Sequence, residues 1–448
     1  MNNQYLPNTP EQRRQMLEVI GADSVEELFR YIPSKLHLNR PLDLPTPLAE
    51  PILVAHLEEL AGKNDTHSVS FLGGGIYDHF SPAAIDHILT RSEFYTAYTP
   101  YQPEVSQGTL QAIFEYQSMI CQLTGADAAN ASLYDGATAV AEAAILALNA
   151  TRNRKLLVAG SMHPWYRQVL ATYMEDLEAE IVEVPIAGGK LDPHALGALL
   201  DKDVAALLVQ SPNFFGIVED LPALGQAMAA FKGLFVVATD PISLGLLESP
   251  AALGADVVIG EGQGLGLGQS FGGPLLGFIG VTEKLIRRMP GRVVGQTVDS
   301  QDRRGYVLTL QTREQHIRRE KATSNICSNQ ALCALAASVY MSLMGPQGLK
   351  EVARQSLLKA DFAREQLTGI PGVGQPFAGP FFKEFVLSLP KPADQVIEAM
   401  AEKGYLAGID LGRFYPELKN HLLVAVTEKR SKEEILGFTA ALKEVLAK

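Results

Sequence analysis

The stretch LFVVATDPISLGLLESPAALGADVVIGEGQGLGLGQSFGGPLLG, residues 234–277, decides the predicted fold. Two short apolar runs, Leu234–Ala238 and Val257–Ile259, are separated by Asp240 and a helical turn. The second run leads into a glycine-rich loop, Gly260–Gly273. Buried strands that carry polar groups at their C-terminal ends are typical of open α/β sheets that bind coenzymes. The stretch therefore predicts a coenzyme site built from a strand-end acid and a loop.

One component of many coenzyme sites is missing from this stretch. Between Phe231 and Thr282 the only lysine is Lys232, which precedes the first of the two strands. A lysine amine is the group that forms an imine with a carbonyl coenzyme. The stretch thus has the outline of such a site without its nucleophile.

The composition is that of an ordinary globular protein. A chain of 448 residues predicts two domains, or a large domain with an appendage. The net charge of −12 argues against a nucleic-acid backbone as the main partner. The N-terminus lacks the apolar core of a signal peptide, and no apolar run approaches the roughly 18 residues that span a membrane. We therefore expect a cytoplasmic protein.

Three cysteines, Cys121, Cys327 and Cys333, show no CxxC spacing. Each lies in an apolar context of helical character, which predicts a reduced and buried thiol. No metal-ligand set is predicted.

The chain divides into three predicted parts: a helical arm at 1–85, a large α/β domain at 86–325 and a smaller α+β domain at 326–448. Strands are predicted at 156–159, 181–184, 205–209, 234–238, 257–259, 275–279, 384–389 and 422–426. Helices are predicted at 52–60, 82–91, 108–124, 136–150, 164–179, 193–200, 221–231, 250–254, 325–344, 346–369 and 393–403. Capping boxes at Thr9, Ser24 and Ser431 predict three more helix starts. Strands that alternate with helices predict a mostly parallel sheet with helices on both faces.

Two residues at predicted strand ends are candidates for coenzyme contacts. His163 follows a strand, so its ring could stack on a planar coenzyme, or it could simply fill a loop. Asp240 is either a turn residue before Pro241 or an acid that pairs with a pyridinium nitrogen. The helix start at 132–138 could bind an anion, although capping by Ser132 or Asp135 explains it equally well.

A tyrosine-rich segment, 94–103, contains four aromatic residues and two prolines. It could form a subunit interface or part of the core, where tyrosine is also common, or the wall of a pocket that presents phenol hydroxyls. The glycine loop at 71–79 could close such a pocket or could be a plain linker. A third segment carries mostly basic residues and is either a solvated face or an anion site: Arg313, Arg318, Arg319, Glu320 and Lys321.

Four motifs together resemble one family. They are FYTAYTPYQPEVSQGTLQAIFEYQSMICQLTG (94–125), NASLYDGATA (130–139), GEGQGLGLGQSFGGPLLGF (260–278) and REKATSNICSNQAL (319–332). They resemble the P-protein of the glycine cleavage system, glycine dehydrogenase (decarboxylating), in the N-terminal-half (α) subunit of its two-subunit form. The resemblance implies the fold of pyridoxal phosphate (PLP) enzymes of fold type I. It also implies glycine decarboxylation, with transfer of the aminomethyl group to the lipoyl arm of H-protein.

The chain departs from the PLP-carrying subunit of that family at one position. The partner has a lysine in a segment resembling NLHKTF, and this lysine falls at about Gly264, beside Gln263. Since glycine cannot form an imine, PLP is expected on a partner subunit 2, and His163 and Asp240 become remnants of a coenzyme site. The family match makes Tyr98 and Tyr101 the leading candidates for residues that wall the partner's active site.

Two alternatives remain open. A self-sufficient PLP enzyme would need its lysine elsewhere, at Lys284 or Lys321, although neither has the expected position. A scaffold or binding protein would have kept the fold and lost catalysis altogether.

Overall fold

A computed structural model describes residues 5, 7–326 and 328–447 and divides the chain into two compact units, Met1–Thr66 and His67–Lys448. The domain boundaries at 85 and 325 that the sequence suggests remain predictions. Cys121 is half-buried and Cys333 is buried, and both are free thiols. Cys327 lies outside the described residues.

The first unit contains two α-helices that bury none of their side chains. Helix α1 (Pro10–Ile20) begins at the predicted capping box, in which the Thr9 hydroxyl accepts a hydrogen bond from the Gln12 amide. Helix α2 (Glu50–Ala61) exposes a run of apolar residues between Ile52 and Leu60. Only short 3₁₀ turns, η1 (Glu26–Phe29) and η2 (Ser34–Leu36), form between them.

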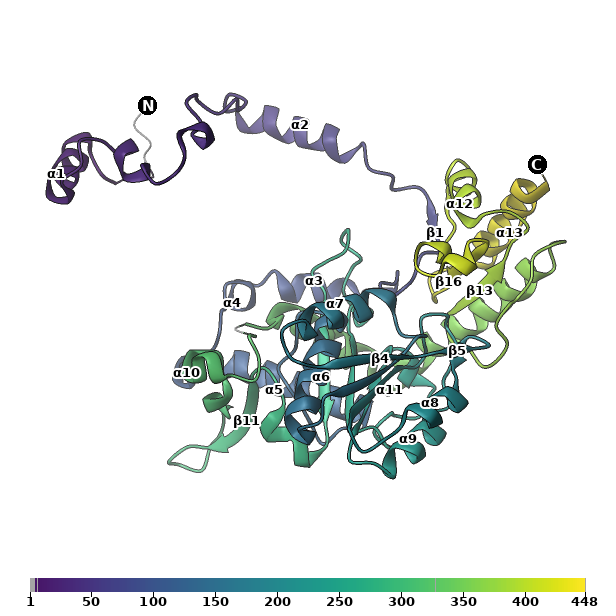
Figure 1. Cartoon of the computed structure of the whole chain (residues 1–448). Coiled ribbons are helices and arrows are strands. Elements are labelled where there is room, and N and C mark those ends of the chain that lie inside the picture. The colour runs from purple at the N-terminus through teal and green to yellow at the C-terminus, as the bar shows by residue number, and fades with distance from the viewer. Residues whose placement is uncertain (1–4, 6, 327, 448) are drawn as a thin grey trace. The chain divides into compact units, whose positions relative to one another are not determined.

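The second unit contains a seven-stranded sheet with the order β2-β10-β9-β8-β7-β3-β4. Its edge strand β4 is labelled in Figure 1. Its strands are β2 (Ala128–Ala129), β3 (Lys155–Ala159), β4 (Glu180–Val184), β7 (Val204–Gln210), β8 (Leu234–Ala238), β9 (Val257–Glu261) and β10 (Gly277–Val281). The pairs from β4 through β9 are parallel, whereas β10 is antiparallel to both β9 and β2. The prediction of a mostly parallel sheet is confirmed.

Helices cover both faces of this sheet, because side chains along each strand alternate between two cores. Phe235 and Val237 of β8 contribute to one core, and Val236 contributes to the other. The first core also receives side chains from α5 (Gln107–Thr124), α8 (Pro193–Leu199), α9 (Leu221–Ala229) and α11 (Ala331–Thr368). The second receives them from α6 (Gly136–Thr151) and α7 (Pro164–Met174). We call this sheet with its helices the large lobe.

The small lobe is the antiparallel sheet β13-β16-β15 with its two helices. Its elements are β13 (Glu384–Ser388), β15 (Ile409–Asp410), β16 (His421–Ala425), α12 (Ala393–Ala401) and α13 (Lys432–Ala447). Helix α13 begins at the predicted capping box, where the Glu434 amide donates to the Ser431 hydroxyl. Strand β1 (Val69–Ser70), which was not predicted, pairs in parallel with β14 (Tyr405–Leu406) of this region.

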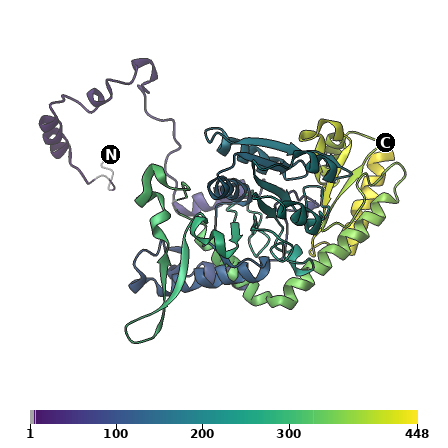
Figure 2. The ribbon, with the colours of Figure 1, turned by 60° about the horizontal axis from the view of Figure 1, so that its bottom comes forward.

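Helix α11 connects the two lobes (Figure 2). It packs on α5 of the large lobe and on α13 of the small lobe. Gly345 has a non-helical conformation with φ of +59°, so the predicted break at Gly345-Pro346 is present. By length and composition alone α11 could span a membrane. Its buried residues in the core of the large lobe identify it instead as a core helix.

Several predicted elements differ from the structure. Residues 250–254 form turns rather than a helix, and α7 ends at Met174 rather than at 179. The hairpin of β11 (Val293–Val298) and β12 (Arg304–Thr309) was not predicted. Besides short 3₁₀ turns, the remaining α-helices and strands of the described residues are α3 (Ala83–Leu89), α4 (Ser92–Tyr95), α10 (Gln315–Arg318), β5 (Ile186–Ala187) and β6 (Lys190–Leu191).

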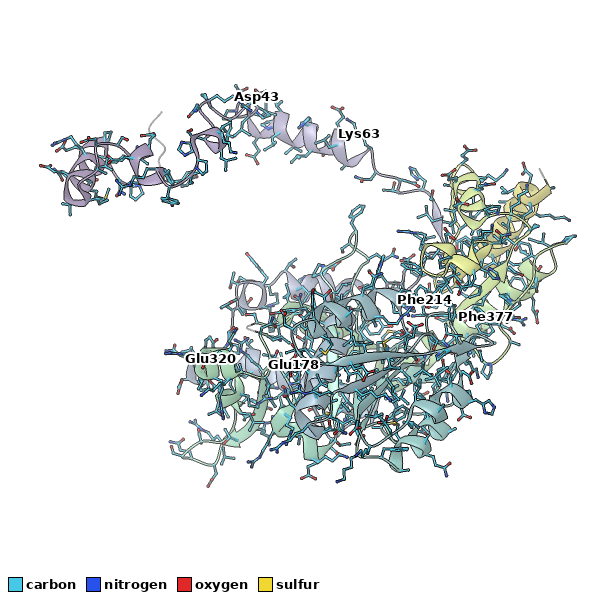
Figure 3. All side chains as sticks on the ribbon, in the orientation of Figure 1. Asp43, Lys63, Glu178, Phe214, Glu320 and Phe377 are labelled. Atoms are coloured by element: carbon cyan, nitrogen blue, oxygen red, sulfur yellow. The ribbon has the colours of Figure 1, made fainter. Side chains whose placement is uncertain are left out.

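An aromatic cluster lies where the lobes meet. Phe215 contacts Phe377 at a ring-centroid distance of 4.9 Å, and Phe214 contacts Tyr415 at 6.4 Å (Figure 3 labels Phe214 and Phe377). Gly216, at the turn beside them, has φ of +81°, and a Cβ there would lie 1.9 Å from the Glu384 carbonyl oxygen. Only glycine allows this approach of the two backbones.

Candidate functional site

Asp240 lies directly beyond the C-terminal end of β8, in the centre of the large sheet. One of its oxygens accepts a hydrogen bond from the Ile242 amide at 3.0 Å, as in an Asx turn. The carboxylate lines a small cavity with Gly75, Tyr77, Tyr166, Gln210, Ala238, Thr239, Gly260 and Glu261. Because the carboxyl ends of parallel strands are where such folds bind ligands, this cavity is the candidate site.

Lys383 from the small lobe reaches this carboxylate. Its Nζ atom lies 2.7 Å from Asp240 Oδ2, and only 1% of its side chain is exposed. The ammonium also lies 3.3 Å from the centroid of the Tyr77 ring, which stabilises the cation further. Lys383 has a φ of +44°, a conformation that residues with a Cβ adopt rarely. The fold therefore holds a strained residue at this place.

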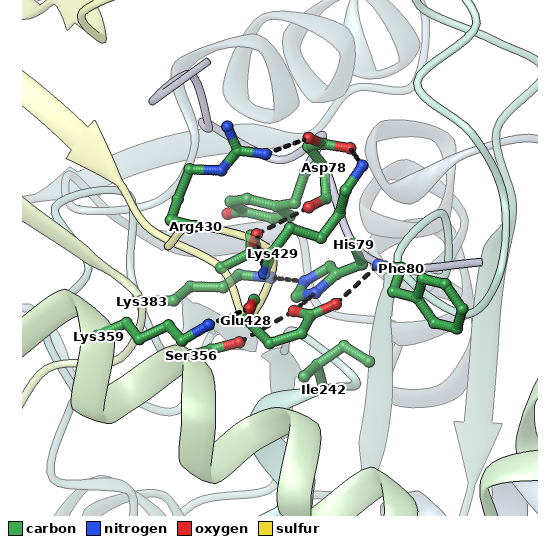
Figure 4. A network of polar contacts seen from close by, with 12 residues as sticks. Asp78, His79, Phe80, Ile242, Ser356, Lys359, Lys383, Glu428, Lys429 and Arg430 are labelled. Carbon is green, nitrogen blue, oxygen red and sulfur yellow. Dashed lines mark hydrogen bonds and ion pairs between the residues drawn. The ribbon is translucent and has the colours of Figure 1, made fainter. Parts of the chain in front are cut away.

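A polar network extends from Lys383 through His79 (Figure 4). Lys383 Nζ lies 2.9 Å from His79 Nε2, and His79 Nδ1 lies 2.6 Å from Glu428 Oε2. Because an ammonium only donates, Nε2 must accept, so Nδ1 carries the proton and donates to the carboxylate. Burial, followed by the nearby Lys383 charge, lowers the pKa of His79 and keeps the ring neutral.

The same network connects the glycine loop at 71–79 to the small lobe. Asp78 accepts hydrogen bonds from Lys429 at 2.6 Å and from Arg430 at 2.9 Å. Glu384 accepts from the Gly74 amide at 2.6 Å and from the Tyr77 hydroxyl at 2.7 Å. Burial raises the pKa of Glu384 to about 7, even though both hydrogen bonds oppose the rise. The loop is thus fixed by charged groups of the small lobe.

Glu261, the last residue of β9, points at the N-terminus of α6. Its Oε2 accepts from the Gly136 amide at 2.9 Å, and its Oε1 accepts from the amides of Gln263 at 3.0 Å and Leu276 at 2.8 Å. Burial raises the pKa of this carboxyl to about 7, and the three amide donors oppose the rise. The predicted anion position at this helix start is occupied by a side chain of the protein.

His163, the N-cap residue of α7, stacks on Tyr166. The ring centroids are 4.7 Å apart with an interplanar angle of 19°. His163 Nε2 donates to the Gly74 carbonyl at 2.7 Å, and Nδ1 accepts from the Trp165 amide at 3.2 Å. Burial lowers the pKa of His163 to about 4, so the imidazole is neutral.

Gln263 and Gly264 lie where the family resemblance places the lysine of the PLP-carrying subunit. The Gln263 side chain is fully buried and exchanges two hydrogen bonds with the backbone of Tyr77, at 2.9 and 3.1 Å. A Cβ on Gly264 would lie 3.1 Å from His79 Cδ2. Both residues therefore pack the loop at 71–79 against the sheet.

The lysines of the rival prediction lie elsewhere. Lys284 pairs with Asp256 at 2.6 Å and has a side chain that is 64% exposed. Lys321 is exposed as well. Neither of them lines the cavity at Asp240.

Tyr98 and Tyr101 also lie outside this cavity, on the large lobe. They are 76% and 47% exposed. Ser328 donates to the Tyr98 hydroxyl at 3.1 Å, and Arg292 donates to the Tyr101 hydroxyl at 2.9 Å. The structure thus places the tyrosine-rich segment 94–103 beside Ser328, which follows the basic residues in the sequence. Of the basic residues, Arg313 donates to the carbonyls of Leu310 and Gly291.

Sequence reasoning missed Lys383, Tyr166 and Glu261 as parts of the site. Glu261 lies two residues beyond the predicted strand 257–259, where the sequence predicts only a glycine-rich loop. Lys383 interrupts the apolar run FFKEFVLSL, and a charge in such a run was the available signal. Tyr166 carried no signal, because tyrosine is common on helices that pack on a sheet.

The mostly parallel sheet with a strand-end acid, a histidine after β3 and a small lobe joined through a long helix defines the class of PLP enzymes of fold type I. Distant solved structures have the same fold. The apo cysteine desulfurase of Thermococcus onnurineus is 17% identical, with a TM-score of 0.62, and the match covers 85% of this chain and 95% of that one.

More similar proteins identify the family. The sequence matches the family model described as glycine cleavage system P-protein over residues 3–442. A crystal structure of glycine decarboxylase (P-protein) in inhibitor-bound form is 45% identical, with a TM-score of 0.87, and covers 99% of this chain and 100% of that one. Proteins named "Probable glycine dehydrogenase (decarboxylating) subunit 1" are 56% identical in Moorella thermoacetica and 54% identical in Desulforamulus reducens. These alignments cover 99% and 98% of this chain, and 100% and 99% of the relatives. The chain belongs to the P-protein family of the glycine cleavage system.

The fold and the family both suggest PLP as the coenzyme of the system. The cavity at Asp240 has a volume of about 30 Å³. That is room for about two water molecules, and it is far below the roughly 300 Å³ of small ligand pockets. The residues present in this chain therefore do not fit the coenzyme.

Proposed function

We propose that this chain is subunit 1 of a decarboxylating glycine dehydrogenase and that a partner subunit 2 carries PLP. The complex removes the carboxyl group of glycine as carbon dioxide and passes the aminomethyl group to the lipoyl arm of H-protein, in the cytoplasm. Membership of the P-protein family and relatives named subunit 1 support the proposal.

The observation that carries the proposal is the absence of an imine-forming lysine from the loop after β9. The loop has Gln263 and Gly264 at the expected place, and both pack against the segment at 71–79. Lys383 is buried at the site, but its Nζ atom is paired with Asp240 at 2.7 Å, and the residue lies on the small lobe rather than in the loop after β9.

In this proposal the chain contributes the wall of the partner's active site rather than its nucleophile. Tyr98 and Tyr101 expose their rings and have hydroxyl oxygens that accept from Ser328 and Arg292. A phenol that accepts in this way still has its own proton to donate, so it can bind a carboxylate such as that of glycine. His163, Asp240, Gln263 and Gly264 then serve the shape of this subunit only.

The first test uses the purified chain alone, incubated with PLP and then reduced with borohydride. We expect no stoichiometric adduct, because the loop after β9 offers no amine. Absorbance of an imine, followed by mass spectrometry of peptides, is the measurement. One PLP bound per chain at a single lysine would refute the proposal. Scattered labelling at exposed lysines such as Lys284 is the background, and Lys284→Arg removes that site.

The second test asks whether the complex needs this chain. Co-expressed with a PLP-bearing subunit 2, the chain should support exchange of bicarbonate into glycine in the presence of H-protein. Subunit 2 alone should lack that exchange. Full activity of subunit 2 without this chain would favour a scaffold instead.

Tyr98→Phe and Tyr101→Phe test the wall of the partner's site. Each removes one hydroxyl, and loss of a hydrogen bond to a charged group lowers turnover about tenfold or more. We expect the complex to stay assembled, as judged by size-exclusion chromatography. Tyr95→Phe is the matched control, since this exposed tyrosine lies in the same segment. Unchanged kinetics for both variants would remove these residues from the site.

A further inference from the structure

We propose that the cavity at Asp240 is a former coenzyme site that side chains of this chain now fill in place of the coenzyme. Glu261, Tyr166 and Lys383 occupy the three positions where a phosphate, a planar ring and a ring cation would bind. This proposal goes beyond the missing lysine, because a phosphorylated coenzyme can be held without an imine. It predicts that the chain excludes such a molecule entirely.

The first position is the N-terminus of α6. Free amides at a helix start attract anions, and the helix dipole adds to the attraction. Here Glu261 already accepts from the Gly136 amide at 2.9 Å. The Tyr166 hydroxyl is close as well, since a Cβ on Gly136 would lie 2.2 Å from it. A phosphate at this place would displace both groups.

The second position is the face of the His163 ring. An aromatic ring at a strand end can hold a planar ligand by stacking. Tyr166 takes this face at a centroid distance of 4.7 Å and nearly parallel to it. Phe214 meets the same imidazole edge-to-face at 4.8 Å. The imidazole is therefore enclosed by side chains of the protein.

The third position is the Asp240 carboxylate. A largely buried acid at this strand end, here 15% exposed, is stabilised by a cation, and the Lys383 ammonium supplies it at 2.7 Å. Lys383 is itself fixed by His79 Nε2 at 2.9 Å and by the Tyr77 ring. Since Lys383 precedes β13 and Asp240 follows β8, the ion pair also joins the two lobes.

The three side chains that fill the site come from separate segments of the chain, and each occupies the position of a different part of a coenzyme. A single change in packing would not place all three there. Glu261 brings carboxyl oxygens that accept from the helix amides, Tyr166 brings a flat ring, and Lys383 brings positive charge. Glu261 and Tyr166, together with Tyr77 and the Asp240 carboxylate that Lys383 pairs with, line a cavity of only about 30 Å³. The site is therefore full and electrostatically satisfied without any added molecule.

The test measures binding of pyridoxamine phosphate, which cannot form an imine with lysine, to the full purified chain. We expect no binding by the wild type at about 1 mM, and binding at or below about 0.1 mM by the double variant Tyr166→Ala/Glu261→Gln, by isothermal titration calorimetry. The double variant removes the Tyr166 ring and the Glu261 carboxyl group, while Asp240 and His163 remain. The control variant Tyr173→Ala/Glu180→Gln makes the same two changes away from the site. Tyr173 is partly exposed in α7 and Glu180 is exposed in β4, so this variant should bind no pyridoxamine phosphate, like the wild type.

Two results would overturn the proposal. One is stoichiometric binding of pyridoxamine phosphate to the wild type. The other is a folded double variant, shown by circular dichroism and a cooperative melt, that binds no better than the wild type. If the double variant does not fold, Tyr166→Leu/Glu261→Gln keeps an apolar side chain at position 166 while removing the ring, and it should bind pyridoxamine phosphate measurably at about 1 mM, where the wild type does not. Equal binding would count against the proposal.

This test is independent of the proposed function. An imine on this chain would refute the assignment of PLP to the partner. Binding of pyridoxamine phosphate to the wild type without an imine would refute only the exclusion argued here.

Discussion

Lys383→Met should lower the free energy of unfolding by about 3–5 kcal/mol, because removing one member of a buried ion pair leaves the other uncompensated. Asp240 would lose its cation, and His79 would lose the donor to its Nε2. Methionine keeps most of the side-chain volume, so the loss reports charge rather than a cavity. Urea unfolding of the isolated chain, followed by circular dichroism, measures the effect.

Two further variants make this prediction specific. Lys383→Met/Asp240→Asn removes both charges and should lose clearly less than the single lysine variant. Lys284→Met removes a lysine that is 64% exposed from its pair with the partly buried Asp256, and it should cost no more than about 1 kcal/mol. If Lys383→Met costs no more than Lys284→Met, the buried pair has no special role in joining the lobes.

Glu142→Gln should stabilise the chain at pH 8 by up to about 3 kcal/mol. Burial within α6 raises the pKa of this carboxyl from 4.5 to about 7, and a hydrogen bond from Ser324 at 2.8 Å opposes the rise. A raised pKa in the folded state means that the native chain favours the protonated acid. Its contribution is complete below about pH 4.5 and is lost as the pH rises through about 7.

The pH profile of stability separates this effect from others. The wild type should lose stability between about pH 5 and pH 8, and Glu142→Gln should show a flatter profile there. Glutamine keeps an acceptor for the Ser324 hydroxyl, so the packing is retained. Glu180→Gln, at an exposed position, is the control and should leave the profile unchanged. Identical slopes for the wild type and Glu142→Gln would mean that this carboxyl ionises in the native state at its ordinary pKa.

Much of the fold follows from local patterns in the sequence. Apolar runs such as 205–209 and 234–238 form the predicted strands, because both of their faces are buried between helices. The capping boxes at Thr9 and Ser431 begin helices as expected. Residues 250–254, which the start signal at Ser249 and Pro250 predicts as a helix, form turns instead, because a segment of five residues is too short to sustain a helix.

The site was only partly predictable, because its contacts depend on tertiary packing. Asp240 and His163 could be found since strand ends converge at one edge of a parallel sheet. Lys383 could not be connected with Asp240, because the approach requires the small lobe, the bend in α11 and a residue with φ of +44°. The predicted roles of Tyr98, Tyr101, His163, Asp240, Gln263 and Gly264 stay predictions until the variants are measured.

Helices α1 and α2 have a consequence for how the chain is made. The arm is synthesised before either lobe, and it buries none of the side chains of these helices on itself. Apolar residues from Ile52 to Leu60 therefore meet the ribosome surface, chaperones and neighbouring chains first. We expect the yield of soluble chain to rise when subunit 2 is produced in the same cell, and to rise less when residues 1–66 have been removed.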